Sequence, residues 1–219
     1  MSMLFVFYLF LLLDVPKSCI AEKDYEFFML AQQWPKGYCN RVGVPCKSRP
    51  NKFTIHGLWP QGRNGQLITN GNDSNHLAYD DIKPVENQLS LNWPSLIGKD
   101  FDFWYSEWKK HGTCSEKEFS KLEYFKLALH NYAQNDLMGI LKRANIVPNK
   151  KQLYNISSVV AAVHQHTQHQ PRLVCYLDTQ LNVSALYEIG ICYGEDGKSY
   201  KNCLDPHGTC RGTELIYPK

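Results

Sequence analysis

The sequence of 219 residues lacks several patterns that would each assign it to a different class of protein. Beyond residue 13, no apolar run is long enough to cross a membrane. No repeat of solenoid period and no linker indicates a second domain. The cysteines show no CxxC spacing, which argues against a structural zinc site. We therefore expect one domain that holds no metal and no other cofactor.

The one long apolar run lies at the N-terminus. Met3–Leu13 is nearly all apolar, too short to span a bilayer but typical of the central region of a signal peptide. Cys19 and Ala21 are small residues at the positions that precede a cleavage site. We expect residues 1–21 to be removed and residues 22–219 to be secreted, with no membrane attachment afterwards. The alternative is a buried N-terminal strand.

Three Asn-x-Ser sequons agree with secretion and predict N-glycans; they begin at Asn72, Asn155 and Asn182. The eight cysteines also suit an oxidising compartment. Cleavage after residue 21 would remove Cys19 and leave seven of the eight, so one thiol would be free or paired outside the chain. The formal charge of +3 indicates a mild attraction for polyanions.

Hydrophobic patterning predicts an α+β fold. The expected strands cover 25–34, 53–58, 172–178 and 185–193. The expected helices cover 81–91, 101–110, 118–129, 134–144 and 157–166. Cys39–Cys46 indicates a small disulfide loop, 61–80 an exposed loop, and Trp59-Pro60 the end of the second strand.

Two aromatic-rich segments carry the candidate chemistry. Residues 53–60 (FTIHGLWP) contain His56, and residues 103–114 (FWYSEWKKHGTC) contain Glu107, Lys110 and His111. At positions i, i+3 and i+4 of a helix, the last three share one face. Gly112 is a natural helix stop.

A pair of histidines with a nearby cation is what cleavage of RNA at its own 2′-hydroxyl requires. One histidine takes the 2′-OH proton and the other protonates the leaving 5′-oxygen, since the ordinary histidine pKa is about 6.5. Lys110 is a cation that can stabilise the negative charge on the phosphorane, and Glu107 can stabilise an imidazolium. For a lone histidine, burial in the core would be the better interpretation. His164, His166 and His169 do not lie in an aromatic-rich segment of this kind and indicate a solvated helix end.

Both segments resemble the two active-site segments of the ribonuclease T2 family. The segments YEFFMLAQQWP and NQLSLNWPSL, the Cys39–Cys46 loop and the C-terminal cysteines are similar to plant members, above all the S-RNases of self-incompatible pistils. The resemblance implies one domain with an antiparallel sheet packed by helices. It also implies His56 as proton donor, His111 as base, and Glu107 and Lys110 as the stabilising pair. The RNA-binding positions it implies are Gln33, Ser95, Leu96, Phe103, Lys110 and His111.

The sequence departs from the family pattern at two places. Ser106 stands where many relatives have a third histidine that binds phosphate. The loop of residues 70–79 lacks the cysteine that would pair with Cys114, which predicts a free thiol there. The last four cysteines allow three pairings, and the resemblance favours Cys175–Cys210 enclosing Cys192–Cys203.

The resulting hypothesis is a secreted, monomeric endoribonuclease that cleaves single-stranded RNA through a 2′,3′-cyclic phosphate. An S-RNase is a nuclease that acts as a cytotoxin in the pistil and is recognised by an F-box protein of the pollen. The loop 61–80 is a candidate surface for that recognition. The alternatives are an S-like enzyme of defence or phosphate scavenging, and a recognition or storage protein whose cleavage is incidental.

Overall fold

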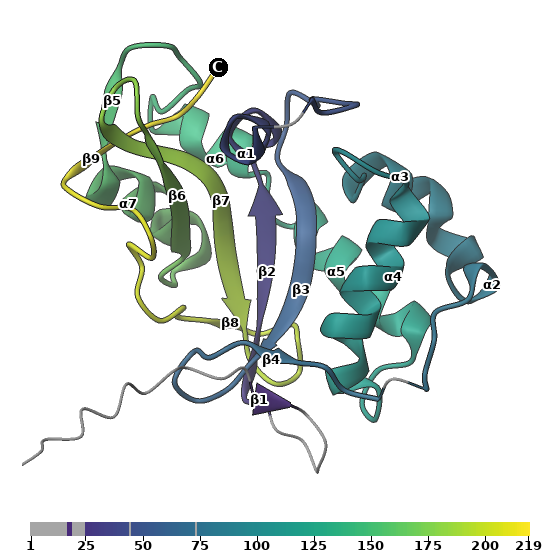
Figure 1. The fold of residues 1–219 in the computed structure, drawn as a ribbon. Helices are drawn as coiled ribbons and strands as arrows, with labels where there is room; N and C mark the ends of the chain where they lie inside the picture. The colour runs from purple at the N-terminus through teal and green to yellow at the C-terminus, as the bar shows by residue number, and fades with distance from the viewer. Residues whose placement is uncertain (1–16, 19–24, 44, 73) are drawn as a thin grey trace, which may run out of the picture.

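The computed structural model describes residues 17–18, 25–43, 45–72 and 74–219. Apart from Lys17–Ser18, the predicted signal peptide lies outside the described residues. Helices gather around a twisted sheet, as the α+β prediction requires (Figure 1). The strands are β1 (Lys17–Ser18), β2 (Phe27–Gln33), β3 (Thr54–Gln61), β4 (Ile68–Thr69), β5 (Leu153–Asn155), β6 (Arg172–Asp178), β7 (Val183–Tyr193), β8 (Tyr200–Lys201) and β9 (Glu214–Ile216). The helices are α1 (Pro35–Val42), α2 (Tyr79–Ile82), α3 (Glu86–Asn92), α4 (Asp100–Lys110), α5 (Lys121–Ala133), α6 (Leu137–Arg143) and α7 (Ile156–Thr167), with 3₁₀ turns η1 (Lys83–Val85) and η2 (Gly112–Ser115).

Strand β7 is the centre of the main sheet. The strand order is β3-β2-β7-β9-β5, and β6 and β8 also pair with β7. All these pairs are antiparallel except β7 with β9, where Ser184 lies opposite Leu215. The short strands β5, β8 and β9 were not predicted, because two or three residues show no usable alternation.

The buried strand β2 separates two apolar clusters. Phe28 and Leu30 point into the main core, which α5 helps to cover, while Phe27 and Met29 point into a smaller cluster on the other face. This alternation follows from the two-residue period of a strand. Trp34 is fully buried and donates its indole N–H to the Pro218 carbonyl at 2.7 Å.

Strand β3 extends further than predicted. It continues through Trp59-Pro60 to Gln61, so the expected strand end at Trp59-Pro60 is wrong. Strand β3 lies at the edge of the order β3-β2-β7, and an edge strand tolerates a proline, which has no N–H to donate to a neighbouring strand. The register shifts between Ala31 and Gln32, which lie opposite Gly57 and Ile55, so His56 is the extra residue of a bulge.

The helix predicted at 81–91 is broken into three parts. Pro84 lies inside the 3₁₀ turn η1, between α2 and α3. Proline has no N–H to donate and disfavours a helical residue before it, which explains the interruption. The helix predicted at 101–110 forms as α4, which begins one residue earlier at Asp100. Helix α1 was missed, so Cys39 lies on a helix rather than in a plain loop.

The three predicted bridges, Cys39–Cys46, Cys175–Cys210 and Cys192–Cys203, are present. The prediction of a free thiol at Cys114 is wrong, since this cysteine is disulfide-bonded. The prediction rested on the missing cysteine of the 70–79 loop. Within the described residues, no helix combines the length and apolar composition that crossing a bilayer requires.

Candidate active site

The C-terminal end of α4 supplies three of the four candidate catalytic residues. Glu107 and His111 are both 5% exposed, whereas Lys110 is exposed. Glu107 Oε2 lies 4.0 Å from His111 Nε2. His111 itself ends the helix, and Gly112 begins η2. The helix thus ends just before Gly112, where the sequence predicts a helix stop, and the missing Cβ of Gly112 leaves room for the Trp108 ring.

The bulge of β3 presents the fourth residue, His56, to the same site. The ring of Trp59 lies 4.9 Å from that of His56 and 5.4 Å from that of His111, so one indole contacts both histidines. Its N–H donates to Glu107 Oε2 at 2.9 Å. Segments about fifty residues apart in the sequence are thus joined through Trp59 and Glu107.

The two histidines have opposite electrostatic environments. Burial disfavours a charge on His56, yet the Glu188 carboxylate raises the pKa of His56 above the ordinary 6.5. Glu107 adds to this rise and Lys110 opposes it. Burial, together with the charges of His56 and Lys110, lowers the pKa of His111 to about 3. The two pKa values therefore shift in opposite directions: His56 keeps its proton to a higher pH than an ordinary histidine does, and His111 is neutral near neutral pH.

Glu107 shares the buried environment of His111. Burial raises the pKa of Glu107, while the charge of His56 and the hydrogen bond from Trp59 lower it. A carboxylate between two imidazoles can stabilise whichever one carries the proton.

Four of the six predicted RNA-binding residues lie together beside His56. They line a hollow of about 260 Å³ along with Tyr38, Ile97, Gly98, Lys99 and Asp102; the four are Gln33, Ser95, Leu96 and Phe103. The ring of Phe103 lies 6.0 Å from that of His56 and remains partly exposed. A flat apolar ring open to solvent can stack on an unpaired base.

Glu188, which no sequence pattern singled out, places its Oε2 2.6 Å from His56 Nδ1. Its sequence signal was an acid in the middle of the apolar strand ALYEIGICY. Ser106 is half-buried on α4. Across the described residues, no three His, Cys, Asp or Glu side chains gather closely enough to hold a metal ion.

The three sequon asparagines are exposed. Asn155 precedes α7 and makes no side-chain cap, and Asn182 adopts a left-handed turn conformation with φ 52° between β6 and β7. The amide of Asn72 differs, because it donates to Glu116 Oε1 at 3.1 Å.

The family comparison agrees with this geometry. Residues 25–203 match the model of the Ribonuclease T2 family, so the chain belongs to this family of enzymes. Extracellular ribonuclease LE of Solanum lycopersicum is 34% identical over 97% of this chain and 96% of its own length.

Two solved structures are similar over most of the chain. Ribonuclease MC1 of bitter gourd, as a mutant in complex with 5′-UMP, is 31% identical with a TM-score of 0.79, covering 89% of this chain and 99% of its own. The SF11-RNase of Nicotiana alata, associated with gametophytic self-incompatibility, is 27% identical with a TM-score of 0.80, covering 90% and 100%.

Proposed function

We propose that this member of the Ribonuclease T2 family cleaves single-stranded RNA by transesterification and needs no metal or other cofactor. The single observation that carries this proposal is the contact of His56 and His111 with one indole, that of Trp59, with the pKa values of the two histidines shifted in opposite directions. His111, neutral and buried, suits the general base. His56, whose pKa the Glu188 carboxylate raises, suits the general acid.

The proton and electron balance of the step is simple. The 2′-oxygen attacks phosphorus while His111 takes its proton, and the P–O5′ bond breaks as His56 gives a proton to the 5′-oxygen. The products are a 2′,3′-cyclic phosphate and a free 5′-hydroxyl. Lys110 stabilises the charge on the non-bridging oxygens, and Glu107 stabilises the imidazolium that forms at His111.

The hollow beside His56 would hold a base next to the cleaved bond. Phe103 supplies the stacking surface, while Gln33 and Ser95 supply polar groups for the edge of the base. A base can enter this hollow only when it is unpaired, which favours single-stranded RNA. The nucleotide complex of ribonuclease MC1 supports this assignment by similarity.

The test measures cleavage of single-stranded RNA with EDTA present by the parent and by His56→Ala and His111→Ala. We expect each variant to lose at least about a hundredfold in rate and the parent products to carry cyclic phosphates. The matched control is His130→Ala, an exposed histidine on α5. An inert, folded parent would instead favour a recognition or storage role.

For the biological role, we propose a secreted, monomeric S-RNase that acts as a pistil cytotoxin. Its basic charge, the extracellular relative and the self-incompatibility structure support this role. The loop 61–80 would face a pollen F-box partner. Expression confined to the pistil is the expected result; expression in leaf or root under phosphate starvation would favour an S-like enzyme of defence or phosphate scavenging.

A further inference from the structure

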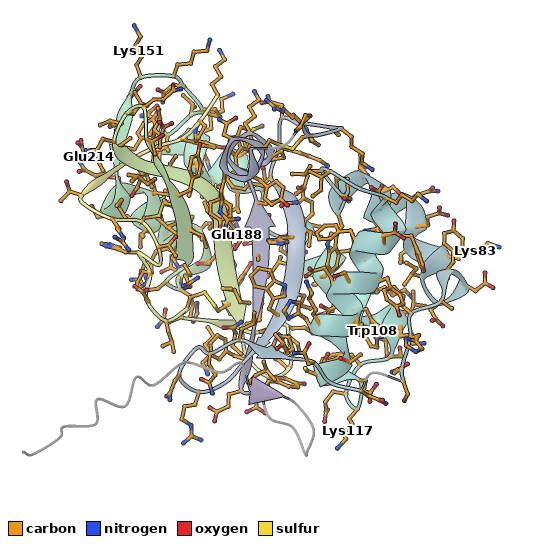
Figure 2. All side chains as sticks on the ribbon, viewed as in Figure 1. Lys83, Trp108, Lys117, Lys151, Glu188 and Glu214 are labelled. Atoms are coloured by element: carbon orange, nitrogen blue, oxygen red, sulfur yellow. A yellow bond between two sulfur atoms is a disulfide. The ribbon has the colours of Figure 1, made fainter. Side chains whose placement is uncertain are left out.

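An acidic side chain buried among the central strands contacts a histidine of the site. Figure 2 shows Glu188 near the middle of the sheet, on β7. Its side chain is 4% exposed and its Oε2 lies 2.6 Å from His56 Nδ1, whose side chain is 26% exposed. Burying a charged carboxylate costs free energy unless the carboxylate is paired, and the His56 imidazole is the partner that Glu188 has here.

The sheet itself brings the two residues together. Strands β3 and β7 both pair with β2, and Gln33 lies opposite both Glu188 and Thr54. His56 is the bulge residue of β3, so it leaves the regular alternation of its strand. The bulge therefore lets the imidazole reach the carboxylate from across β2.

We propose that Glu188 is a positioning residue that holds the His56 ring by Nδ1, so that Nε2 faces the RNA and delivers the proton to the leaving 5′-oxygen. This inference rests on the proposed function. In the step, the Nε2–H bond breaks, the 5′-oxygen gains that proton, and neutral His56 keeps its Nδ1–H on Glu188. Nδ1, which bonds the carboxylate, therefore takes no part in the proton transfer to the 5′-oxygen.

Several titratable or charged groups besides Glu188 lie around His56, and of these Glu107 raises its pKa while Lys110 lowers it. From α4 and its end come Glu107, Lys110 and His111, and around the base hollow stand Tyr38, Lys99 and Asp102. Among these, Glu107 is shared with Trp59, whereas Glu188 bonds the His56 ring directly. Removing the Glu188 charge should therefore change the pKa of His56 more than any other single acidic substitution.

The first measurement is the ¹⁵N spectrum of the His56 ring in the unmutated protein without RNA. Above the pKa of His56 we expect a proton on Nδ1 and a bare Nε2. A proton on Nε2 with a bare Nδ1 would overturn the proposal. Because no RNA is present, this result does not depend on whether the chain cleaves it.

The second measurement is the pH profile of kcat/KM for Glu188→Gln, Glu188→Asp and the parent. Glu188→Gln should lower kcat about tenfold and move the alkaline limb, with the His56 titration, down by about one pH unit. Glu188→Asp, which keeps the charge, should restore much of the shift. The control Glu214→Gln changes an exposed acid on β9 and should match the parent.

A folded Glu188→Gln variant with the parental alkaline limb and His56 titration would show that Glu188 is merely structural. If Glu188→Gln does not fold, the ring protonation of the parent and the Glu188→Asp profile still decide the question. A parent that is inert on RNA but shows the expected His56 ring would overturn the proposed function and leave the pairing intact.

Discussion

At the scale of single residues, Gly57 shows how tightly the two histidine segments pack. It follows His56 on the bulge of β3, and a Cβ there would overlap both Trp59 Nε1 and Glu107 Oε2. These two atoms form the hydrogen bond that links β3 to α4. Since its φ is not positive, Gly57 is required for space and not for backbone conformation.

We therefore expect Gly57→Ala to push Trp59 and Glu107 apart and to lower kcat at least about tenfold. Overpacking should also reduce the free energy of unfolding by about 1–3 kcal/mol. RNA cleavage assays and urea denaturation measure the two effects.

The control for that variant is Gly194→Ala, where the nearest atom to an added Cβ is Asp196 Oδ1 at 3.5 Å. It should change neither quantity much. Parental activity in Gly57→Ala would mean that the Trp59–Glu107 bond is not needed for catalysis.

At the scale of elements, the start of α5 illustrates how local chemistry sets a boundary. Ser120 accepts from the Glu123 backbone N–H at 3.3 Å, and Glu123 Oε2 accepts from the Ser120 backbone N–H at 2.8 Å. This capping box starts the helix at Lys121, three residues later than the periodicity predicted. Helix α5 in turn buries Tyr124, which donates to the Leu58 carbonyl of β3 at 2.6 Å.

Ser120→Ala should lower the free energy of unfolding by about 1 kcal/mol and Tm by about 2–4 °C. The hydrogen bonds from Ser120 lower the pKa of Glu123, so the capping contribution is present above the ordinary pKa and is lost as pH falls. Thermal unfolding near neutral pH and near pH 3 measures both effects.

Ser158→Ala, at an exposed position inside α7, is the matched control and should leave Tm unchanged or slightly higher. Equal Tm values for Ser120→Ala and the parent at neutral pH would show that the box adds nothing to stability.

At the scale of the whole molecule, the predicted secretion can be tested directly on the mature protein. Expressed with its own N-terminus in plant cells, the chain should appear in the medium, begin at residue 22 and carry N-glycans. Because the Asn72 amide already bonds Glu116, we expect fuller occupancy at Asn155 and Asn182. Intact mass before and after deglycosylation measures the cut and the glycans.

Asn155→Gln and Asn182→Gln should each remove one glycan mass, while Asn64→Gln, outside any sequon, should remove none. A cut before Lys17 would keep β1 and its pairing with β4 on the mature chain, contrary to the predicted site after Ala21. Retention inside the cell would contradict secretion itself.

Local sequence alone determined much of this protein. The two histidine segments, the α4 helix with Glu107, Lys110 and His111 on one face, and strand β6 follow from periodicity and residue chemistry within short windows. Only the tertiary structure decided the bulge at His56, the passage of β3 through Pro60 and the contact with Glu188, 132 residues away. These depend on strand neighbours and burial, which a short stretch of sequence does not contain.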